Sequence, residues 1–169
     1  NAIADLLLGK EEPTARLTMS FPRKTGQCPI YYNCFNTGRP RIPDTLENSN
    51  YVSSYRDTLN APLYPFGYGL GYTDWEIGGV RLSSEKIVEG GRVTVSARLK
   101  NTGKRAGSAL VQLYIRDRFA SVVRPLKELK GFQRVSLAAG EEREVCFDLS
   151  EEMLRFYTCL LYTSDAADE

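Results

Sequence analysis

The chain is predicted to be mainly β, with an antiparallel β-sandwich in its second half. Apolar and polar residues alternate from Val93 to Lys100, which is the period of a strand with one buried face. The same alternation returns in three later runs, at 111–115, 135–137 and 145–149. The turns Asn101-Thr-Gly103 and Ala138-Ala-Gly-Glu141 separate these runs. Short strands with regular turns between them favour two packed antiparallel sheets.

Residues 1–40 have a different character. Three apolar residues share one face of a helix over 2–8, and Gly9 stands where a C-terminal cap belongs, so we expect a helix that begins upstream. Alternation over 17–21 predicts a short strand that ends at Pro22. The aromatic run at 27–33 predicts a second strand.

Two connecting segments follow. Residues 41–60 are polar and show neither hydrophobic period, so we predict a long surface connection. The run Leu63–Thr73 then combines four aromatic residues with three glycines and one proline. Pro65 fixes its own φ, the glycines allow close backbone approach, and the aromatic rings supply apolar area to bury. This composition predicts a rigid hinge between two domains.

The overall composition excludes several classes of function. The 169 residues carry 22 basic and 21 acidic side chains, and the basic ones are scattered, which disfavours a nucleic-acid partner. The longest apolar runs, such as Leu6–Leu8, fall far below the roughly 20 residues that cross a bilayer. The first residues lack the pattern of a signal peptide. We therefore expect neither a nucleic-acid nor a membrane partner.

The cysteines carry little chemistry. The chain has four cysteines, no CxxC pair and no histidine, so we expect no metal site. Cys28 and Cys34 lie close enough in sequence for a hairpin disulfide in an exported protein, and free thiols are the favoured alternative.

Three ordered motifs carry a resemblance to a known family: Asn36-Thr-Gly-Arg-Pro40, the aromatic run Leu63–Thr73, and Arg124-Pro125 followed by Leu-Lys-Glu-Leu-Lys-Gly-Phe132. Together they resemble the C-terminal part of glycoside hydrolase family 3, the β-glucosidase and β-xylosidase family. Asp117 and Ser121-Val122 precede Arg124 in the family's order. Gly71 departs from the pattern, since the family usually has serine there.

The resemblance implies a division into domains. Residues 1–40 correspond to the end of the family's α/β sandwich domain, and 41–74 to the connecting segment and aromatic hinge. Residues 75–157 correspond to a fibronectin type III-like, or Ig-like, antiparallel β-sandwich that is incomplete at its C-terminal strands. We expect 158–169, which lack strand alternation and end acidic, to be a non-native tail. A natural disordered tail is the alternative.

The resemblance also implies a function. The parent would be a retaining glycoside hydrolase that removes nonreducing-end sugars without a cofactor, and this chain would be its accessory C-terminal part. The family's nucleophile, an aspartate, and its acid/base, a glutamate, both lie upstream of the matched region, so we expect no catalytic, cofactor-binding or metal residue here and an inactive fragment. Its partners would be the catalytic domains and an oligo- or polysaccharide. The substrate-binding residues stay unassigned, and localisation stays open between a periplasmic or secreted bacterial parent and a cytoplasmic one.

Four polar residues before the hinge are candidates for substrate contacts. Asp44, Glu47 and Asp57 lie among Asn and Ser residues, where acids are usually solvated or form turns, so we expect no catalytic role for them. Arg39 is predicted to form an ion pair at a domain seam, and a contact with substrate is the alternative.

The second half offers further candidates. Arg124 is predicted to order a long loop, with Asp117 as a possible partner, and a contact with substrate is the alternative. Trp75 and Tyr114 could stack on a sugar, but an aromatic residue in an alternating strand is more often part of the core. A stand-alone fibronectin-like module that binds carbohydrate or mediates adhesion is the alternative function, and it requires a complete sandwich.

Overall fold

The computed structural model describes residues 1–40, 51–157 and 163–164. The chain forms two compact units. Unit 1 comprises Asn1–Ala15, Leu70–Ile115 and Leu129–Glu169, and unit 2 comprises Arg16–Gly69 and Arg116–Glu128. Both units therefore draw on segments that are far apart in the sequence.

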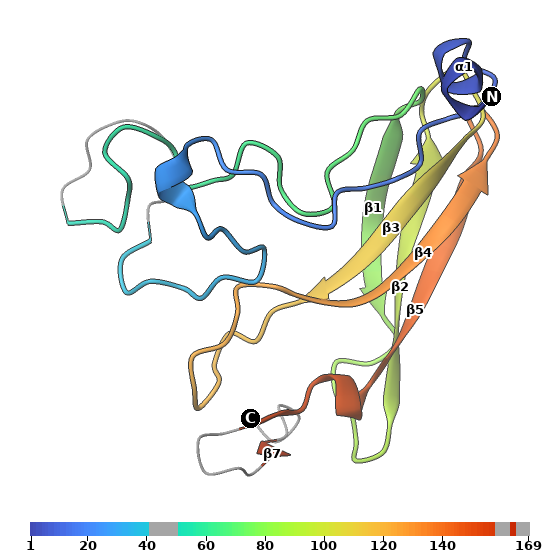
Figure 1. The fold of residues 1–169 in the computed structure, drawn as a ribbon. Coiled ribbons are helices and arrows are strands. Elements are labelled where there is room, and N and C mark those ends of the chain that lie inside the picture. The colour runs from blue at the N-terminus through green and yellow to red at the C-terminus, as the bar shows by residue number, and fades with distance from the viewer. Residues whose placement is uncertain (41–50, 158–162, 165–169) are drawn as a thin grey trace. The chain divides into compact units, whose positions relative to one another are not determined.

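Unit 1 contains the long strands. These are β1 (Trp75–Leu82), β2 (Arg92–Asn101), β3 (Gly107–Ile115), β4 (Glu128–Leu137) and β5 (Glu142–Ser150). One sheet has the order β1-β2-β5 and a second pairs β3 with β4. Figure 1 shows these strands running in roughly the same direction along unit 1, with helix α1 (Ala2–Leu7) beyond one end of them. The predicted alternation between Val93 and Lys100 is confirmed by the alternating burial along β2.

One apolar core joins the two sheets. Its buried side chains come from four strands: Leu99 of β2, Ala109 and Val111 of β3, Val135 and Leu137 of β4, and Val145 of β5. Trp75 and Phe147 pack against this cluster. Because both sheets contribute inward-facing residues to one core, the arrangement is a β-sandwich. The mainly β class predicted from the sequence is confirmed.

The register of the three-stranded sheet differs between its two ladders. β2 and β5 pair antiparallel without interruption from Arg92↔Ser150 to Lys100↔Glu142. β1 pairs antiparallel with β2, but its register shifts between Gly78 and Arg81. Gly79 lies in this irregularity with φ at +64°, a backbone conformation that favours glycine. The edge strand β1 therefore carries a bulge.

Asn101, at the end of β2, is fully buried. Its Nδ2 donates to the carbonyl oxygens of Arg105 at 2.7 Å and Leu137 at 3.4 Å. Its Oδ1 accepts from the Thr73 hydroxyl at 2.6 Å and the Gly103 amide at 3.0 Å. A buried amide is tolerated when its hydrogen bonds are made, and here both ends of the amide have partners. Asn101 thus fixes the predicted turn at 101–103.

The Glu12 carboxylate connects the N-terminal segment to the strands. Oε1 accepts from the Tyr72 amide at 3.0 Å, and Oε2 accepts from the Ser108 amide at 2.8 Å. Two glycines make room for it, since a Cβ on Gly71 or Gly107 would lie 2.6 Å from a carboxylate oxygen. We call this arrangement the Glu12 clamp.

Side chains around the clamp support it. The Tyr72 hydroxyl donates to the Leu6 carbonyl oxygen at 2.7 Å, and the Arg105 guanidinium donates to the Gly9 carbonyl oxygen at 2.5 Å. Gly9 has φ at +67° after the end of α1, which confirms it as the predicted C-terminal cap. The apolar residues of α1 are largely exposed, with Leu7 at 81%, so hydrogen bonds rather than apolar packing secure this segment.

After β5 the chain forms the 3₁₀ turn η2 (Glu151–Met153). Ser150 precedes it at the N-cap position, but its side chain makes no capping hydrogen bond. The Glu151 carboxylate, 1% exposed, accepts instead from the Gly90 amide and from Arg155 Nε at 3.0 Å. A buried carboxylate needs such partners to offset its desolvation. Two short strands follow, β6 (Phe156–Tyr157) and β7 (Thr163–Ser164), which pair antiparallel.

Unit 2 contains little regular structure among the described residues. The predicted strand at 17–21 runs along the aromatic segment, where Leu17 and Phe21 amides donate to the Tyr68 and Tyr64 carbonyl oxygens, both at 2.8 Å. Within 17–21, Phe21 alone forms a β-bridge, and its partner is Tyr64. Pro65 has no N–H to donate, so a continuous ladder does not form here. The aromatic rings pack together, with Tyr32 stacked on Phe66 at 4.4 Å between centroids.

The second predicted strand, at 27–33, is absent from the structure. The 3₁₀ turn η1 (Thr25–Gln27) stands at its start, and Gln27 is 2% exposed. The Gln27 Nε2 donates to the Leu59 carbonyl oxygen at 2.9 Å, and its Oε1 accepts from the Arg23 amide at 2.5 Å. This amide holds the backbone in a turn, which competes with extended pairing.

The predicted boundaries after residues 40 and 74 stay predictions. The boundary between unit 2 and unit 1 lies within the aromatic segment, between Gly69 and Leu70. The predicted tail at 158–169 lies outside the described residues except for β7, so its non-native origin also stays a prediction.

Replacing Asn101 by alanine should lower the free energy of unfolding by about 2–3 kcal/mol, because the Leu137 and Arg105 carbonyl oxygens would lose their donor in a buried site. Urea denaturation followed by circular dichroism measures this. Thr102→Ala, at the exposed neighbouring position, is the matched control and should change the value by less than about 0.5 kcal/mol. Equal effects of the two substitutions would contradict the assigned role of Asn101.

Gly71→Ser should destabilise unit 1, because its Cβ would push the Glu12 carboxylate off the Tyr72 and Ser108 amides. The same substitution in a Glu12→Ala background should cost about 1 kcal/mol less, since neighbouring residues couple. A double-mutant cycle measured by thermal denaturation gives this difference, with Glu11→Ala as the control for removing a carboxylate. Additive effects would rule out the clamp.

Candidate functional site

Unit 2 contains a large open groove of about 740 Å³. Its apolar wall includes Pro29, Ile30, Tyr31, Phe35, Pro40, Tyr55 and Leu126. The lining comes from three segments of the chain, 27–40, 53–60 and 116–126. Polar side chains from these segments complete it, among them Asn36, Thr37, Ser53, Ser54, Asn60 and Arg116. We call this the unit 2 groove.

The turn that begins the groove is held by Gln27, and the opposite wall by Asn60. The Asn60 Nδ2 donates to the Ser53 carbonyl oxygen at 2.9 Å, and its Oδ1 accepts from the Tyr55 amide at 3.1 Å. The side-chain amides of Gln27 and Asn60 therefore both hydrogen-bond to backbone atoms. The groove is shaped by them, but their hydrogen-bonding capacity is largely used.

The loop 116–128 forms another side of the groove. Phe35 and Pro125 make an antiparallel β-bridge, and the Leu126 amide donates to the Cys34 carbonyl oxygen at 2.9 Å. Arg124 Nη2 lies 2.6 Å from Glu128 Oε1, and its Nε lies 4.0 Å from Asp117 Oδ2. The predicted pairing of Arg124 with Asp117 is confirmed, and its closer partner Glu128 was missed. The sequence held no signal for this second pair, because an i,i+4 spacing brings side chains together only on a helix and residues 124–127 are not helical.

The chemistry of the groove favours binding over acid–base catalysis. Its described lining contains no Asp or Glu and one permanent cation, Arg116. Tyr31 and Phe35 are 64% and 61% exposed. An exposed apolar surface with a few polar groups is typical of a binding surface.

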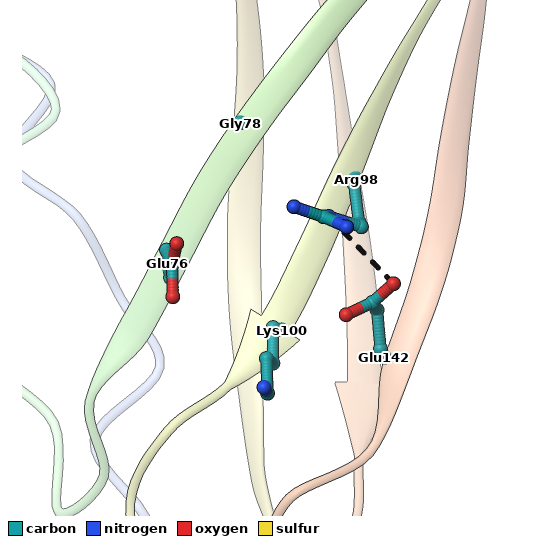
Figure 2. Close-up of a pocket in the computed structure, with 5 residues that line it drawn as sticks. All are labelled: Glu76, Gly78, Arg98, Lys100 and Glu142. Atoms are coloured by element: carbon teal, nitrogen blue, oxygen red, sulfur yellow. Dashed lines mark ion pairs between the residues drawn. The ribbon is translucent and has the colours of Figure 1, made fainter.

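A second, shallow hollow lies on the exposed face of the three-stranded sheet in unit 1 (Figure 2), lined by Glu76, Gly78, Arg98, Lys100 and Glu142. Lys100 pairs with Glu76 on one neighbouring strand and with Glu142 on the other, and Arg98 Nε lies 3.6 Å from Glu142 Oε1. The central strand is basic and its neighbours are acidic. Opposite charges across strands stabilise the register, each by a modest amount.

Comparisons with known proteins identify the family. Residues 1–72 match the glycosyl hydrolase family 3 C-terminal domain, and residues 109–159 match the fibronectin type III-like domain. The periplasmic β-glucosidase of Salmonella typhimurium is 47% identical over 157 residues, which are 93% of this chain and 20% of that protein. The chain belongs to glycoside hydrolase family 3.

Other family 3 proteins support the assignment. A β-xylosidase of Formosa agariphila is 40% identical over 158 residues, covering 91% of this chain and 20% of that protein. The crystal structure of a Listeria innocua β-glucosidase in complex with isofagomine superposes with a TM-score of 0.88 at 43% identity, covering 96% of this chain and 22% of that one. The chain thus spans about a fifth of the length of its relatives and corresponds to their C-terminal part.

The two acids in the hollow of Figure 2 lie on the two outer strands of the sheet, with β2 between them. Both side chains are exposed and face the cationic side chains of Arg98 and Lys100. Such surroundings are typical of surface ion pairs. We therefore assign the hollow a structural role and call its alternating charges, Glu76, Arg98, Lys100 and Glu142, the charge ladder.

The other candidates from the sequence have varied outcomes. Trp75 packs against the core cluster, as expected. Tyr114 is half-buried and its hydroxyl donates to Gln112 Oε1 at 3.0 Å. Asp44 and Glu47 lie outside the described residues. Arg39 is exposed and its carbonyl oxygen accepts from the Ser53 amide at 2.8 Å, so its predicted ion pair stays a prediction.

Three cysteines, Cys28, Cys34 and Cys146, are exposed free thiols. Within 1–40, 51–157 and 163–164, no cluster of three or more His, Cys, Asp or Glu side chains could hold a metal ion. No helix in this described part is long and apolar enough to cross a membrane. The expectation that the chain carries no catalytic residue stays a prediction.

Asp57 lies in an exposed ion pair, with its Oδ2 2.7 Å from Lys24 Nζ. The hydrogen bond from Lys24 and its positive charge hold the pKa of Asp57 below the ordinary 3.8. NMR titration should therefore give a pKa below 3.8, and Lys24→Ala should raise it toward that value. Because the folded pKa is depressed, any stability from this pair is present above pH 3.8 and is lost as the pH falls through the folded pKa. An unchanged pKa in the variant would disprove the pairing.

Proposed function

We propose that this chain is the accessory C-terminal part of a retaining family 3 glycoside hydrolase that removes nonreducing-end sugars from oligo- or polysaccharides. Similarity over 93% of the chain to one fifth of a periplasmic β-glucosidase is the observation that carries the proposal. Its β-sandwich buttresses catalytic domains that lie elsewhere in the longer protein, and the parent's nucleophile and acid/base belong to those domains. The parent reaction uses two carboxyl groups and no cofactor.

The roles of the acids in this chain support an accessory part. Glu12 and Glu151 accept backbone amides, so their carboxylates serve the fold. Asp117 and Glu128 flank Arg124. A general acid or nucleophile needs a carboxyl group that faces a substrate cavity, and the described lining of the unit 2 groove has none.

The isolated chain should not hydrolyse p-nitrophenyl β-glucoside or β-xyloside above the buffer rate. Replacing the matched fifth of the Salmonella typhimurium β-glucosidase by residues 1–157 of this chain should give a hybrid that hydrolyses one of them. Release of p-nitrophenol measures both.

Substitutions of Glu76 and Glu142, the two acids of the charge ladder, are the control for any hydrolysis by the isolated chain. Hydrolysis by the isolated chain that disappears in Glu76→Gln or Glu142→Gln would show that this fragment has its own active site. A hybrid that folds and yet hydrolyses neither glycoside would count against the proposed parent function.

A further inference from the structure

The unit 2 groove is more exposed and more apolar than a solvated surface requires. Tyr31 and Phe35 lie in its wall with more than half of each side chain exposed, and Tyr55 is 39% exposed. Clustered exposed aromatic residues of this kind mark an interaction site. They lie on a framework fixed by Gln27 and Asn60, so the groove is preformed.

The polar groups of the groove indicate which class of molecule it binds. A saccharide is held by several side-chain donors and acceptors that point to its hydroxyl groups. Here the Gln27 and Asn60 amides are directed to backbone atoms, and the described lining has no carboxylate. The polar side chains left to face an occupant are those of Asn36, Thr37, Ser53, Ser54 and Arg116. The surface that remains consists mainly of aromatic, proline and aliphatic groups, which match the apolar side chains of a polypeptide.

The relatives are much longer than this chain, and their additional residues are a source for that polypeptide. The chain matches 20% of the Salmonella typhimurium β-glucosidase and 22% of the Listeria innocua enzyme, so most of each relative lies outside the matched region. We propose that the unit 2 groove docks a polypeptide segment of the longer family 3 protein, with apolar side chains against Tyr31, Phe35 and Tyr55 and a carbonyl or carboxylate facing Arg116. This inference rests on the proposed function.

Hydroxyl-radical footprinting with mass spectrometry tests the groove directly, since Tyr and Phe rings report their own exposure. Oxidation of Tyr31 and Phe35 is compared between the isolated chain and the hybrid enzyme described above. We expect both rings to be oxidised severalfold more slowly in the hybrid. Rates that are equal in the two proteins, in a hybrid that hydrolyses its glycoside, would overturn the docking inference and leave the proposed function standing.

A pair of substitutions in the hybrid gives an independent measurement. Phe35→Asp places a charge in the groove, whereas Phe119→Ser removes a ring that is 80% exposed and does not line it. We expect Phe35→Asp to lower the Tm of the hybrid and Phe119→Ser to leave it unchanged. Equal Tm values for both variants and the parent hybrid would also overturn the inference.

A third experiment, with an added saccharide, distinguishes a carbohydrate from a polypeptide as the occupant of the groove. Cellotetraose is added to the isolated chain during footprinting, and we expect no protection of Tyr31 or Phe35. Protection of these two rings by cellotetraose alone would assign the groove to carbohydrate and would overturn the polypeptide proposal.

Discussion

The buried amide of Asn101 is the interaction on which the sandwich depends. It binds Thr73 from the aromatic segment, two groups of its own turn, and the Leu137 carbonyl oxygen at the end of β4. The backbone of the same residue bonds to the turn at 138–141. One side chain thereby connects both sheets at one end of the strands. The Glu12 clamp extends this end to the N-terminal segment.

The organisation of the two units follows from where such polar contacts fall. Residues 1–15 join the strands through Glu12 and Arg105, although the family comparison assigns them to the C-terminal hydrolase domain. The loop 116–128 joins residues 16–69 through Phe35 and Cys34. Each unit is therefore completed by a segment that lies elsewhere in the sequence.

The local features were predictable from the sequence, and the tertiary ones were not. Alternation identified β2, and the turn residues placed the ends of the strands, because both depend on neighbouring residues. The strand predicted at 27–33 failed because the Gln27 amide reaches carbonyl groups more than thirty residues away. Gly71 departs from the family's usual serine for a reason that only the tertiary structure shows, since the Glu12 carboxylate lies against it. The groove had no signal, since its walls come from separate segments.

The bulge in β1 has a consequence for behaviour in concentrated solution. β1 is the edge of its sheet, and its outer row of backbone groups faces away from β2. At Gly79 that row loses its regular spacing, so a second flat strand cannot extend along it. Ile77, Val80 and Leu82 are exposed on this strand and would otherwise favour such growth. The irregularity at Gly79 thus disfavours assembly into fibres along this edge.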